Sequence, residues 1–455
     1  MARAKKEAAL TPEDRLQAAL VPDWEWPYKL PENWCWTTVG AINQYVGISA
    51  DPTKAKNKTF ELYSVPSSAD NYPEIVLGAD IGSTKQSVKK GDVLLCKINP
   101  RINRVWKVSK YTDHSLLASS EWIVIRNSGL ISNYLMWCFR SPYFRGYMLS
   151  NVSGVGGSLM RAQPKFVQGY PVPVPPLAEQ QRIVDRIESL FSKLDEAKEK
   201  AQAVVDSFET RKAAILHKAF TGELTAKWRE EHGVGMESWK KKSVGELCIS
   251  LKYGTAKKSD ASGNVAVLRM GNLQQGEIDW SDLAYSNDPD DIEKYKLFPG
   301  DVLFNRTNSA ALVGKTAIYR GEHPAIYAGY LIKLDYDHDK IIGDYLNYAL
   351  NTLDAKKYCN SVKTDGVNQS NINAKKIGAY SFNVPSIPEQ EKIVSVIQKL
   401  LSKEQQTKEA AEIVLDLIEL MKKSILARAF RGELGTNDPS EESAVELLKE
   451  IIRRG

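Results

Sequence analysis

Residues 179–224 read EQQRIVDRIESLFSKLDEAKEKAQAVVDSFETRKAAILHKAFTGEL, and residues 389–434 read EQEKIVSVIQKLLSKEQQTKEAAEIVLDLIELMKKSILARAFRGEL. The second segment follows the first by 210 residues without a gap, and 22 of the 46 aligned positions are identical. A period this long indicates two copies of a whole unit and excludes a solenoid of short repeats. The sequence therefore predicts a protein with two-fold character in one chain, which suits a target that also has two halves.

Each copy has the pattern of a long helix. Apolar residues alternate in steps of four and three over 183–215, with Arg211 as an interruption, and over 393–425, with breaks at Glu404 and Thr407. Such steps are typical of a coiled-coil seam. About 40 helical residues span roughly 60 Å. A seam of that length must be buried, so we expect each helix to pack against the other.

The ends of both helices carry start and stop signals. Prolines lie directly before each helix, within 171–176 and 385–388, and a glycine follows each helix, Gly222 or Gly432. Proline is typical near a helix start and glycine after a helix end. A two-fold axis that relates the copies makes the helices run in opposite directions, so the predicted pair is antiparallel.

Two weakly related domains accompany the helices. Residues 30–175 and 225–385 contain short runs rich in Val, Ile, Tyr and Trp, separated by Gly, Asn, Asp and Pro. This pattern is typical of strand-rich α/β domains. The sequence Gly-Asp-Val-Leu occurs in both, at 91–94 and 300–303.

The predicted fold class is α+β. Two α/β domains are separated by the long antiparallel helices, 176–224 and 386–434, with internal pseudo-two-fold symmetry. Residues 1–29 are expected to form a helical or flexible leader. The two-fold axis would bring this leader near the C-terminal segment 435–455, which is itself predicted to be a short helix.

Composition describes an ordinary soluble protein. Of the 455 residues, 43% are hydrophobic and 26% charged, and no apolar run approaches the length of a membrane helix. The five cysteines are scattered, which argues for reduced thiols in a cytoplasm and against zinc or disulfides. The net charge of +5 permits nucleic-acid binding without requiring it.

The order of these parts resembles a known family. A globular domain, a proline-rich turn with Glu-Gln-x-x-Ile-Val, a long helix ending in Ala-Phe-x-Gly-Glu-Leu, and then all of it again is similar to the specificity subunit of type I restriction-modification enzymes. The resemblance covers roughly residues 30–435. It implies that each domain is a target recognition domain for one half of a bipartite DNA sequence, and that the helices are a spacer.

The resemblance also implies partners. Two adenine-specific methyltransferase subunits, which hold S-adenosylmethionine, would dock on the helices. A restriction subunit, a motor-nuclease that uses ATP and Mg, would join for cleavage. The specificity subunit itself binds no cofactor or metal and has no catalytic residue.

Two loops and two later segments are predicted to contact DNA. Arginine suits guanine edges, asparagine adenine edges, and lysine phosphate. In the first domain the candidates are Lys97, Asn99, Arg101, Asn103, Arg104 and Lys107, with Arg161 and Lys165 before the prolines. In the second they are Asn305, Arg306, Asn308 and Lys315, with Asn368, Gln369, Asn371 and Lys375. The alternative is polar surface loops after buried strands.

The net charge of the first domain favours DNA binding more than the net charge of the second domain does. Residues 30–175 carry 16 basic and 9 acidic side chains, a net charge of +7. Residues 236–385 carry 19 basic and 18 acidic side chains, a net charge of +1. The second domain would therefore need its basic residues clustered on one face.

The most strongly repeated motifs flank the helices. They suggest either two equivalent partner-docking sites or matched helix caps, and the sequence leaves both readings open. The docking candidates are Glu179, Gln180, Gly222, Glu223 and Leu224 in one copy and Glu389, Gln390, Gly432, Glu433 and Leu434 in the other.

The sequence contains only incomplete forms of the motifs that would make the chain itself an enzyme. Asn99-Pro100-Arg101 lacks the second proline and aromatic residue of an adenine methyltransferase motif. Gly314-Lys315-Thr316 resembles the end of a phosphate-binding loop, but Ser309 stands where the first glycine is required. A self-contained methyltransferase or nuclease, and a structural coiled-coil interaction protein, are the two alternatives to a DNA-specificity subunit.

Overall fold

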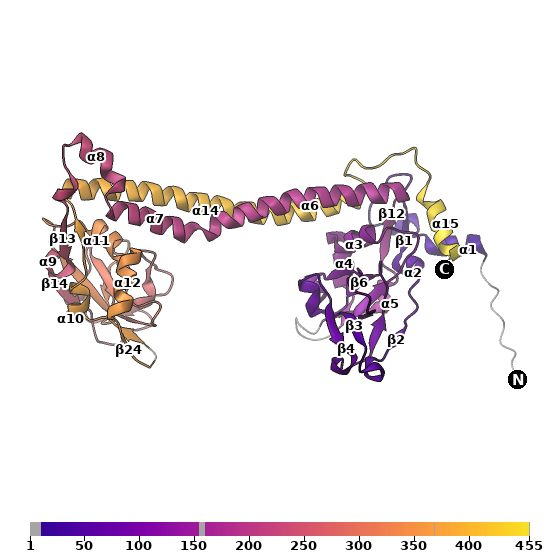
Figure 1. The fold of residues 1–455 in the computed structure, drawn as a ribbon, viewed down its shortest axis with the longest axis horizontal. Coiled ribbons are helices and arrows are strands. Elements are labelled where there is room, and N and C mark those ends of the chain that lie inside the picture. Colours follow the sequence, from indigo (N-terminus) through magenta and orange to yellow (C-terminus); the bar gives the residue numbers. More distant parts are fainter. Residues whose placement is uncertain (1–10, 154–159, 368, 455) are drawn as a thin grey trace. The chain divides into compact units, whose positions relative to one another are not determined.

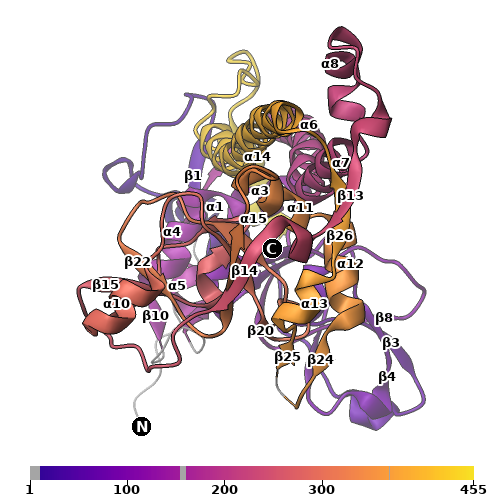
Figure 2. The same cartoon turned by 90° about the vertical axis from the view of Figure 1, so that its left-hand side faces the viewer.

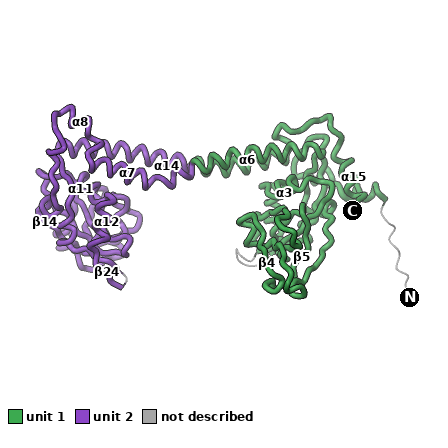
Figure 3. Tube along the Cα trace, viewed as in Figure 1, with its two compact units in different colours: residues 1–200, 414–455 green, residues 201–413 purple. Residues whose placement is uncertain are grey.

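The computed structural model describes residues 11–153, 160–367 and 369–454. The chain forms two compact units (Figure 3). Unit 1 comprises residues up to Lys200 together with those from Val414 onward, and unit 2 comprises Ala201–Ile413. Each unit contains one globular domain and a part of both long helical segments. Unit 2 is one continuous segment of the chain, whereas unit 1 is built from two segments.

The first long segment is two helices rather than the single helix that the seam predicts. It forms α6 (Leu177–Asp206) and α7 (Phe208–Phe220), whereas the second copy is one helix, α14 (Ile387–Ala429). Between α6 and α7 the hydroxyl of Ser207 donates to the carbonyl of Ala203. Hydroxyls that bond the backbone in this way bend and weaken helices, and the aligned residue of α14 is Leu417, which cannot do so.

The long helices pack antiparallel within each unit, as predicted. In unit 1, Lys198 pairs with Glu419 at 2.7 Å and Asp195 pairs with Lys422 at 2.5 Å. As the residue number increases from Asp195 to Lys198 in one helix, the number of the paired residue decreases from Lys422 to Glu419 in the other. This order shows that the helices are antiparallel.

Unit 2 repeats this arrangement. Arg211 pairs with Glu404 at 2.5 Å, and the ammonium of Lys408 lies 5.1 Å from the ring centre of Phe208. One polar interruption of each predicted seam, Arg211 and Glu404, therefore meets the other across the helix pair, and the two charges neutralise each other.

The predicted seam of α14 is only partly buried. Ile393, Ile397 and Ile418 are buried, but Val414 and Met421 are 40% and 51% exposed. Leu417 and Leu420 on the same stretch are 50% and 59% exposed. This stretch of α14 therefore presents an apolar face that no described residue covers.

The domain of unit 1 contains three main sheets. A five-stranded sheet has the order β2-β5-β8-β3-β4, with β3 and β8 parallel, and a three-stranded sheet has the order β7-β6-β9. A third sheet pairs β1 with β12, which closes the domain at the start of α6. The strands are β1 (Cys35–Thr38), β2 (Ser49–Ala50), β3 (Thr59–Tyr63), β4 (Glu74–Leu77), β5 (Lys85–Ser87), β6 (Val93–Cys96), β7 (Val105–Lys107), β8 (Ser115–Ala118), β9 (Trp122–Ile125), β10 (Val152–Ser153), β11 (Arg161–Ala162) and β12 (Pro171–Val174); the helices are α2 (Val39–Ile42), α3 (Ser132–Arg140), α4 (Pro142–Ser150) and α5 (Pro164–Val167).

The domain of unit 2 has a related plan. A four-stranded sheet has the order β14-β23-β19-β21, two three-stranded sheets have the orders β18-β15-β22 and β20-β25-β24, and β13 pairs with β26 as β1 does with β12 (Figure 2). The strands are β13 (Lys240–Ser243), β14 (Cys248–Tyr253), β15 (Val265–Leu268), β16 (Leu273–Gln274), β17 (Glu277–Ile278), β18 (Ala284–Ser286), β19 (Val302–Asn305), β20 (Thr307–Asn308), β21 (Thr316–Ile318), β22 (Ala325–Tyr327), β23 (Leu331–Tyr336), β24 (Thr364–Asp365), β25 (Ser370–Asn371) and β26 (Ser381–Val384); the helices are α8 (Ala226–Glu231), α9 (Val244–Leu247), α10 (Pro289–Tyr295), α11 (Gly343–Leu350), α12 (Leu353–Val362) and α13 (Ala374–Gly378).

The leader and the C-terminal segment meet in unit 1, as predicted. Helix α1 (Pro12–Ala19) packs against α15 (Ala444–Arg454), and Figure 1 shows the two side by side. Leu448 and Ile451 of α15 are buried in the core of this unit.

A helix in the equivalent position connects each domain to a long helix. In unit 1, α3 packs on β6 and β7 and meets α6, where the rings of Trp137 and Phe191 lie 5.0 Å apart. In unit 2, α11 packs on β19 and β21 and meets α7, where the rings of Phe220 and Tyr345 lie 4.9 Å apart. The landmark Gly-Asp-Val-Leu leads into β6 and β19 and therefore marks equivalent core strands.

A buried glutamate begins each long helix. In unit 1, Glu179 is fully buried and accepts hydrogen bonds from Trp34 Nε1 at 2.7 Å and Asn437 Nδ2 at 2.9 Å. Burial raises the pKa of this carboxyl, and its hydrogen bonds oppose the shift. Asn437 follows the end of α14, so this carboxylate joins the domain, the start of one long helix and the end of the other.

Unit 2 contains an equivalent buried glutamate, and we call each of these carboxylates together with its hydrogen-bond donors an anchor. Glu389 is fully buried and accepts from Trp239 Nε1 at 3.0 Å, Arg229 Nη1 at 2.7 Å and Thr225 Oγ1 at 2.8 Å. Thr225 and Arg229 follow the end of α7. The anchor of unit 2 thus contains an ion pair where that of unit 1 has an amide.

The neighbouring glutamines also join the start of each long helix to its domain. The side-chain carbonyl of Gln180 accepts from the backbone of Ile131 at 3.0 Å, and that of Gln390 accepts from Ile342 at 3.0 Å. Both glutamines are fully buried. The docking prediction is therefore wrong for Glu179, Gln180, Glu389 and Gln390, because side chains without exposed surface cannot contact a partner.

The Gly-Glu-Leu motifs shape the turns after the helices. Gly222 and Gly432 have φ angles of 83° and 74°, a left-handed conformation that strains other residues. Leu224 and Leu434 pack against the cores. Of these docking candidates, only Glu223 and Glu433 have exposed side chains.

No helix within the described ranges is both long enough and apolar enough to span a bilayer.

We predict that Glu389→Ala destabilises the protein by about 3–5 kcal/mol, because it leaves a buried guanidinium and an indole N–H without their acceptor. Chemical denaturation followed by circular dichroism measures this loss. Glu391→Ala, at an exposed position two residues further along the same helix, is the control and should change stability by less than about 0.5 kcal/mol. Equal effects of the two substitutions would contradict the anchor.

Candidate nucleic-acid interface

The first-domain candidates lie in two segments that the fold joins. Ile98 and Arg161 form an antiparallel bridge, the backbone N–H of Ala162 donates to the carbonyl of Lys97 at 2.8 Å, and that of Asn99 donates to Met160 at 2.8 Å. The loop after β6 and the strand β11 are therefore neighbours, although about sixty residues of chain separate them.

The second-domain candidates are joined in the same way. Strand β20 pairs with β25 through Thr307 and Asn371, and the backbone N–H of Ile372 donates to the carbonyl of Arg306 at 2.8 Å. This hydrogen bond is equivalent to the one between Ala162 and Lys97. The backbone thus builds the same junction twice and fills it with different side chains.

Several candidates present exposed side chains at these junctions. Arg101, Arg161, Lys165, Gln369 and Lys375 are exposed. Lys165 and Lys375 occupy equivalent positions in the short helices α5 and α13. Lys97, Arg104 and Asn308 are half-buried.

Two of the arginines are held by neighbours that the sequence did not suggest. Arg161 pairs with Glu121 at 3.3 Å. The guanidinium of Arg306 lies 4.7 Å from the ring centre of Tyr253 and donates to the carbonyl of Gly329 at 3.3 Å. Stacking on an aromatic ring orients a guanidinium. Glu121, Tyr253 and Gly329 come from strands or turns far away in sequence, and no local signal marks them.

The asparagines of the loops have structural roles instead. Asn99 and Asn103 have φ angles of 47° and 54°, on either side of the short turn Pro100–Ile102. Asparagine tolerates this left-handed conformation better than most residues. Asn305 is fully buried, and its side-chain carbonyl accepts from the backbone of Thr307 at 3.3 Å. The prediction of a base contact is wrong for Asn305, because its side chain has no accessible surface.

Two lysines lie away from the junctions. Lys107 donates to Asn133 on α3 at 2.5 Å, and Lys315 donates to Gln274 at 2.8 Å. These partners lie toward the long helices rather than toward β11 or β25. Asn368 lies outside the described residues.

Basic side chains gather around the β20-β25-β24 sheet. Lys363 and Lys376 join Arg306 and Lys375 there: Lys376 donates to Thr364 at 2.6 Å, and Lys363 lies 3.9 Å from Asp365. The second domain has a net charge of only +1, so DNA binding would require its basic side chains to cluster on one face. The basic side chains around this sheet form part of such a cluster.

The described residues offer no candidate for bound metal chemistry. Within the described ranges, no three His, Cys, Asp or Glu side chains come together as a cation site.

Comparison with known proteins agrees with this architecture. The family profile of the type I restriction modification DNA specificity domain matches residues 236–413. The type I restriction enzyme StySPI specificity subunit of Salmonella potsdam is 27% identical over 70% of this chain and 71% of its own length. The EcoKI specificity subunit of Escherichia coli K12 is 28% identical over 72% of this chain and 73% of its own length. This chain is therefore similar to type I specificity subunits over about 70% of its length, and residues 236–413 match their DNA specificity domain.

Solved structures share the fold of this chain. The HsdS subunit from Thermoanaerobacter tengcongensis covers 90% of the chain with a TM-score of 0.63 and 22% identity. A chain from a study of complex assembly and conformational transition of the type I R-M system covers 90% with a TM-score of 0.72 and 21% identity. Both structures are covered over their full length, so this chain, with its mixed helix-and-sheet domains and long helix pair, has the fold of these two structures.

We predict that Asn103→Val destabilises the protein by about 1–2 kcal/mol, since a β-branched residue is strained at a positive φ angle. Asn103→Gly adopts this conformation freely and loses only the hydrogen bond to the carbonyl of Arg140, so its effect should be smaller. Thermal unfolding of both variants tests the role of Asn103 in the turn. A larger loss for the glycine variant would show that the amide, rather than the backbone conformation, matters.

Proposed function

We propose that this chain is the DNA-specificity subunit of a type I restriction-modification enzyme and reads a bipartite, asymmetric DNA target. The observation that carries the proposal is the doubled junction, in which one backbone hydrogen-bond pattern, Ala162 to Lys97 and Ile372 to Arg306, presents two different sets of polar side chains. Equivalent sites with different residues suit two unlike half-sites. The similarity to type I specificity subunits supports the same role.

Each domain is proposed to read one half of the target. Residues 30–175 form the first target recognition domain and residues 225–385 the second, with the long helices 176–224 and 386–434 as the spacer between the half-sites. Pseudo-two-fold symmetry of the whole is part of this proposal. It is supported by the pairs of equivalent hydrogen bonds, among them Tyr134 to the carbonyl of Pro173 and Tyr345 to that of Asn383, at 2.8 and 2.9 Å.

The chain is proposed to be non-catalytic and to act with partners. Two methyltransferase subunits would supply S-adenosylmethionine-dependent adenine methylation, and restriction subunits would supply ATP- and Mg-dependent cleavage. The incomplete motifs for catalysis and the family relationship support this division of work.

The apolar face of α14 is the proposed docking surface for a methyltransferase subunit. Val414, Leu417, Leu420 and Met421 are 40–59% exposed, and exposed apolar patches of this kind mark protein interfaces. The aligned residues of the first copy are Val204, Ser207, Thr210 and Arg211. The two copies therefore offer a methyltransferase unequal surfaces, although the repeat itself predicts equal ones.

We predict that Arg101→Ala weakens recognition of one half-site and Arg306→Ala that of the other. A lost arginine–guanine contact costs about 1–3 kcal/mol, roughly tenfold or more in affinity. Binding of the methyltransferase complex to probes with either half scrambled, measured across salt concentrations, separates this from a lost phosphate contact, which weakens all probes alike. Arg15→Ala on α1 removes the same charge outside the junctions and serves as the control.

We predict that lengthening both long helices together widens the gap between half-sites without changing either half. Seven residues add about 10.5 Å, roughly three base pairs. Because the helices are antiparallel, the insertions belong after Ala203 and before Ile413, so that pairs such as Lys198–Glu419 and Arg211–Glu404 keep their register. Methylome sequencing reads the new target. Altered half-site bases with an unchanged gap would refute the spacer.

We predict that Leu420→Lys weakens binding of a methyltransferase subunit at least tenfold, because it places a charge in an apolar interface. Thr210→Lys alters the aligned, exposed position of the first copy and should have little effect. Mass photometry of the reconstituted complex measures occupancy of both sites. Equal loss in the two variants would favour two equivalent docking sites instead.

A further inference from the structure

We infer that unit 2 contains a pocket that binds a phosphate group, between α7, the loop before β21, and α12. This site lies apart from the β20–β25 junction and goes beyond the proposed reading of bases. The phosphate belongs either to free inorganic phosphate or a small phosphorylated molecule, or to the backbone of DNA.

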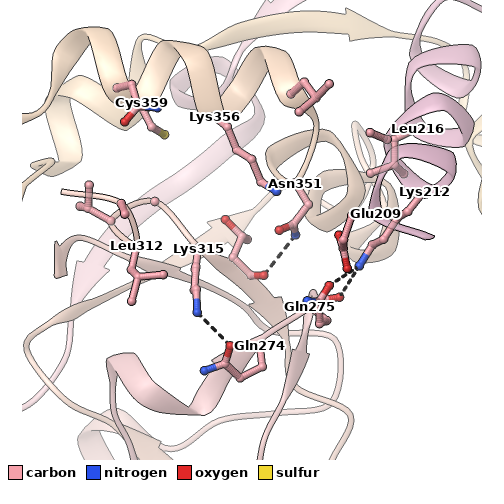
Figure 4. Close-up of a pocket in the computed structure, with 17 residues that line it drawn as sticks. Glu209, Lys212, Leu216, Gln274, Gln275, Leu312, Lys315, Asn351, Lys356 and Cys359 are labelled. Atoms are coloured by element: carbon pink, nitrogen blue, oxygen red, sulfur yellow. Dashed lines mark hydrogen bonds between the residues drawn. The ribbon is translucent and has the colours of Figure 1, made fainter. Parts of the chain in front are cut away.

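The pocket is a cavity of about 380 Å³ into which three lysines from different elements project (Figure 4). Lys212 belongs to α7, Lys315 precedes β21, and Lys356 belongs to α12. Glu209 is the acidic residue among its lining side chains. A cavity of this size is within the usual range for small-molecule sites, and its net positive charge suits an anion.

The lysine ammoniums retain free hydrogen-bonding capacity. Lys212 donates to the side-chain carbonyl of Gln275 at 2.8 Å, and Lys315 to that of Gln274 at 2.8 Å. Each ammonium has three donors, so both retain donors for a ligand. The backbone N–H of Lys356 donates to Thr352, but its ammonium makes no hydrogen bond or ion pair with any residue of the described part of the chain.

A buried hydroxyl in the same cavity also lacks a partner. Thr316 is 1% exposed and lines the pocket, and its Oγ1 has no hydrogen bond among the described residues. An unsatisfied buried polar group costs about 1–3 kcal/mol. An acceptor oxygen from a bound phosphate would remove this cost.

Burial and a neighbouring positive charge both disfavour the charged form of Lys212. The pKa of Lys212 is lowered, chiefly by burial and further by the nearby charge of Lys356, while Glu209 opposes the shift. A bound anion would stabilise both ammoniums.

The pocket is not a nucleotide-hydrolysing loop despite its sequence Gly314-Lys315-Thr316. Thr316 begins a strand, β21, whereas a phosphate-binding loop of that class leads into a helix. Gly314 has a φ angle of 91°, and a Cβ atom there would lie 2.9 Å from Cys359 Sγ on α12. This glycine thus holds the loop against α12 and brings Lys315 and Lys356 to one cavity.

Unit 1 lacks these features at the equivalent positions. The strand registers of β7 and β21 align Val105 with Thr316, so the hydroxyl is absent. Arg140 donates to the carbonyl of Val105, as Asn351 does to that of Thr316. Lys422, the repeat equivalent of Lys212, is neutralised by Asp195 at 2.5 Å. The anion site is therefore a property of the second unit alone.

Titration of the full chain with inorganic phosphate at constant ionic strength, followed by ³¹P NMR line broadening and calorimetry, tests the site. Saturable binding should weaken at least tenfold in Lys212→Gln and in Lys356→Gln. Thr316→Val, which keeps the side-chain shape, should weaken binding several-fold while leaving the thermal unfolding temperature unchanged or higher. Lys357→Gln, an exposed neighbour on α12 that does not line the cavity, is the matched control.

A second measurement identifies the source of the phosphate. If DNA supplies it, Lys356→Gln lowers the salt dependence of DNA binding by the methyltransferase complex by about one ion, and inorganic phosphate competes with DNA. If a free phosphate is the ligand, the salt dependence is unchanged and only the phosphate titration responds. Absence of both effects, or an equal loss in Lys357→Gln, overturns the pocket. Half-site recognition by the same variants is read separately, so failure of the pocket leaves the proposed function standing.

Discussion

The buried carboxylates of Glu179 and Glu389 are the contacts on which each unit depends. Each carboxylate lies at the start of a long helix and accepts hydrogen bonds from a domain tryptophan and from residues that follow the end of the other long helix. A buried charge is tolerated only when such donors surround it. Three parts of the chain must therefore meet at one point in each unit, which explains why the Glu-Gln and Gly-Glu-Leu motifs are the best-preserved parts of the repeat. The choice between helix caps and docking sites, open from the sequence, is decided for the glutamates by their complete burial.

The helix pair shows how polar residues can break a seam and still specify it. Arg211 and Glu404 interrupt their respective apolar patterns, yet they pair with each other across unit 2. An ion pair of two partly exposed side chains adds little stability. It does, however, restrict register, because a shift of either helix leaves two charges unpaired within the seam. The copies diverge where Ser207 interrupts the first helix and Leu417 continues the second, so the duplication preserves the anchors more strictly than the middle of the helices.

The polar candidates of the domains divide into three groups once the chain is folded. Arg101, Arg161 and Arg306 lie at the two equivalent junctions, where the proposed readout takes place. Asn99, Asn103 and Asn305 instead hold turns and strand ends. Lys315 leaves the junction and joins Lys212 and Lys356 in a cavity. A polar residue in a loop therefore predicts a surface or a turn equally well, since side-chain amides bond backbone as readily as they bond a ligand.

The sequence alone determined the duplication, the two helical segments, their antiparallel pairing, the strand-rich domains and the resemblance to type I specificity subunits. These features depend on periodicity and repetition, both of which are visible in the order of residues along the chain. Only the tertiary structure decided which polar residues are accessible, that Arg161 has Glu121 as its partner and Arg306 lies on Tyr253, and that three lysines from separate elements enclose one cavity. The physical reason is that burial and pairing are set by contacts between residues tens to hundreds of positions apart, and no local pattern in the sequence records which of them meet.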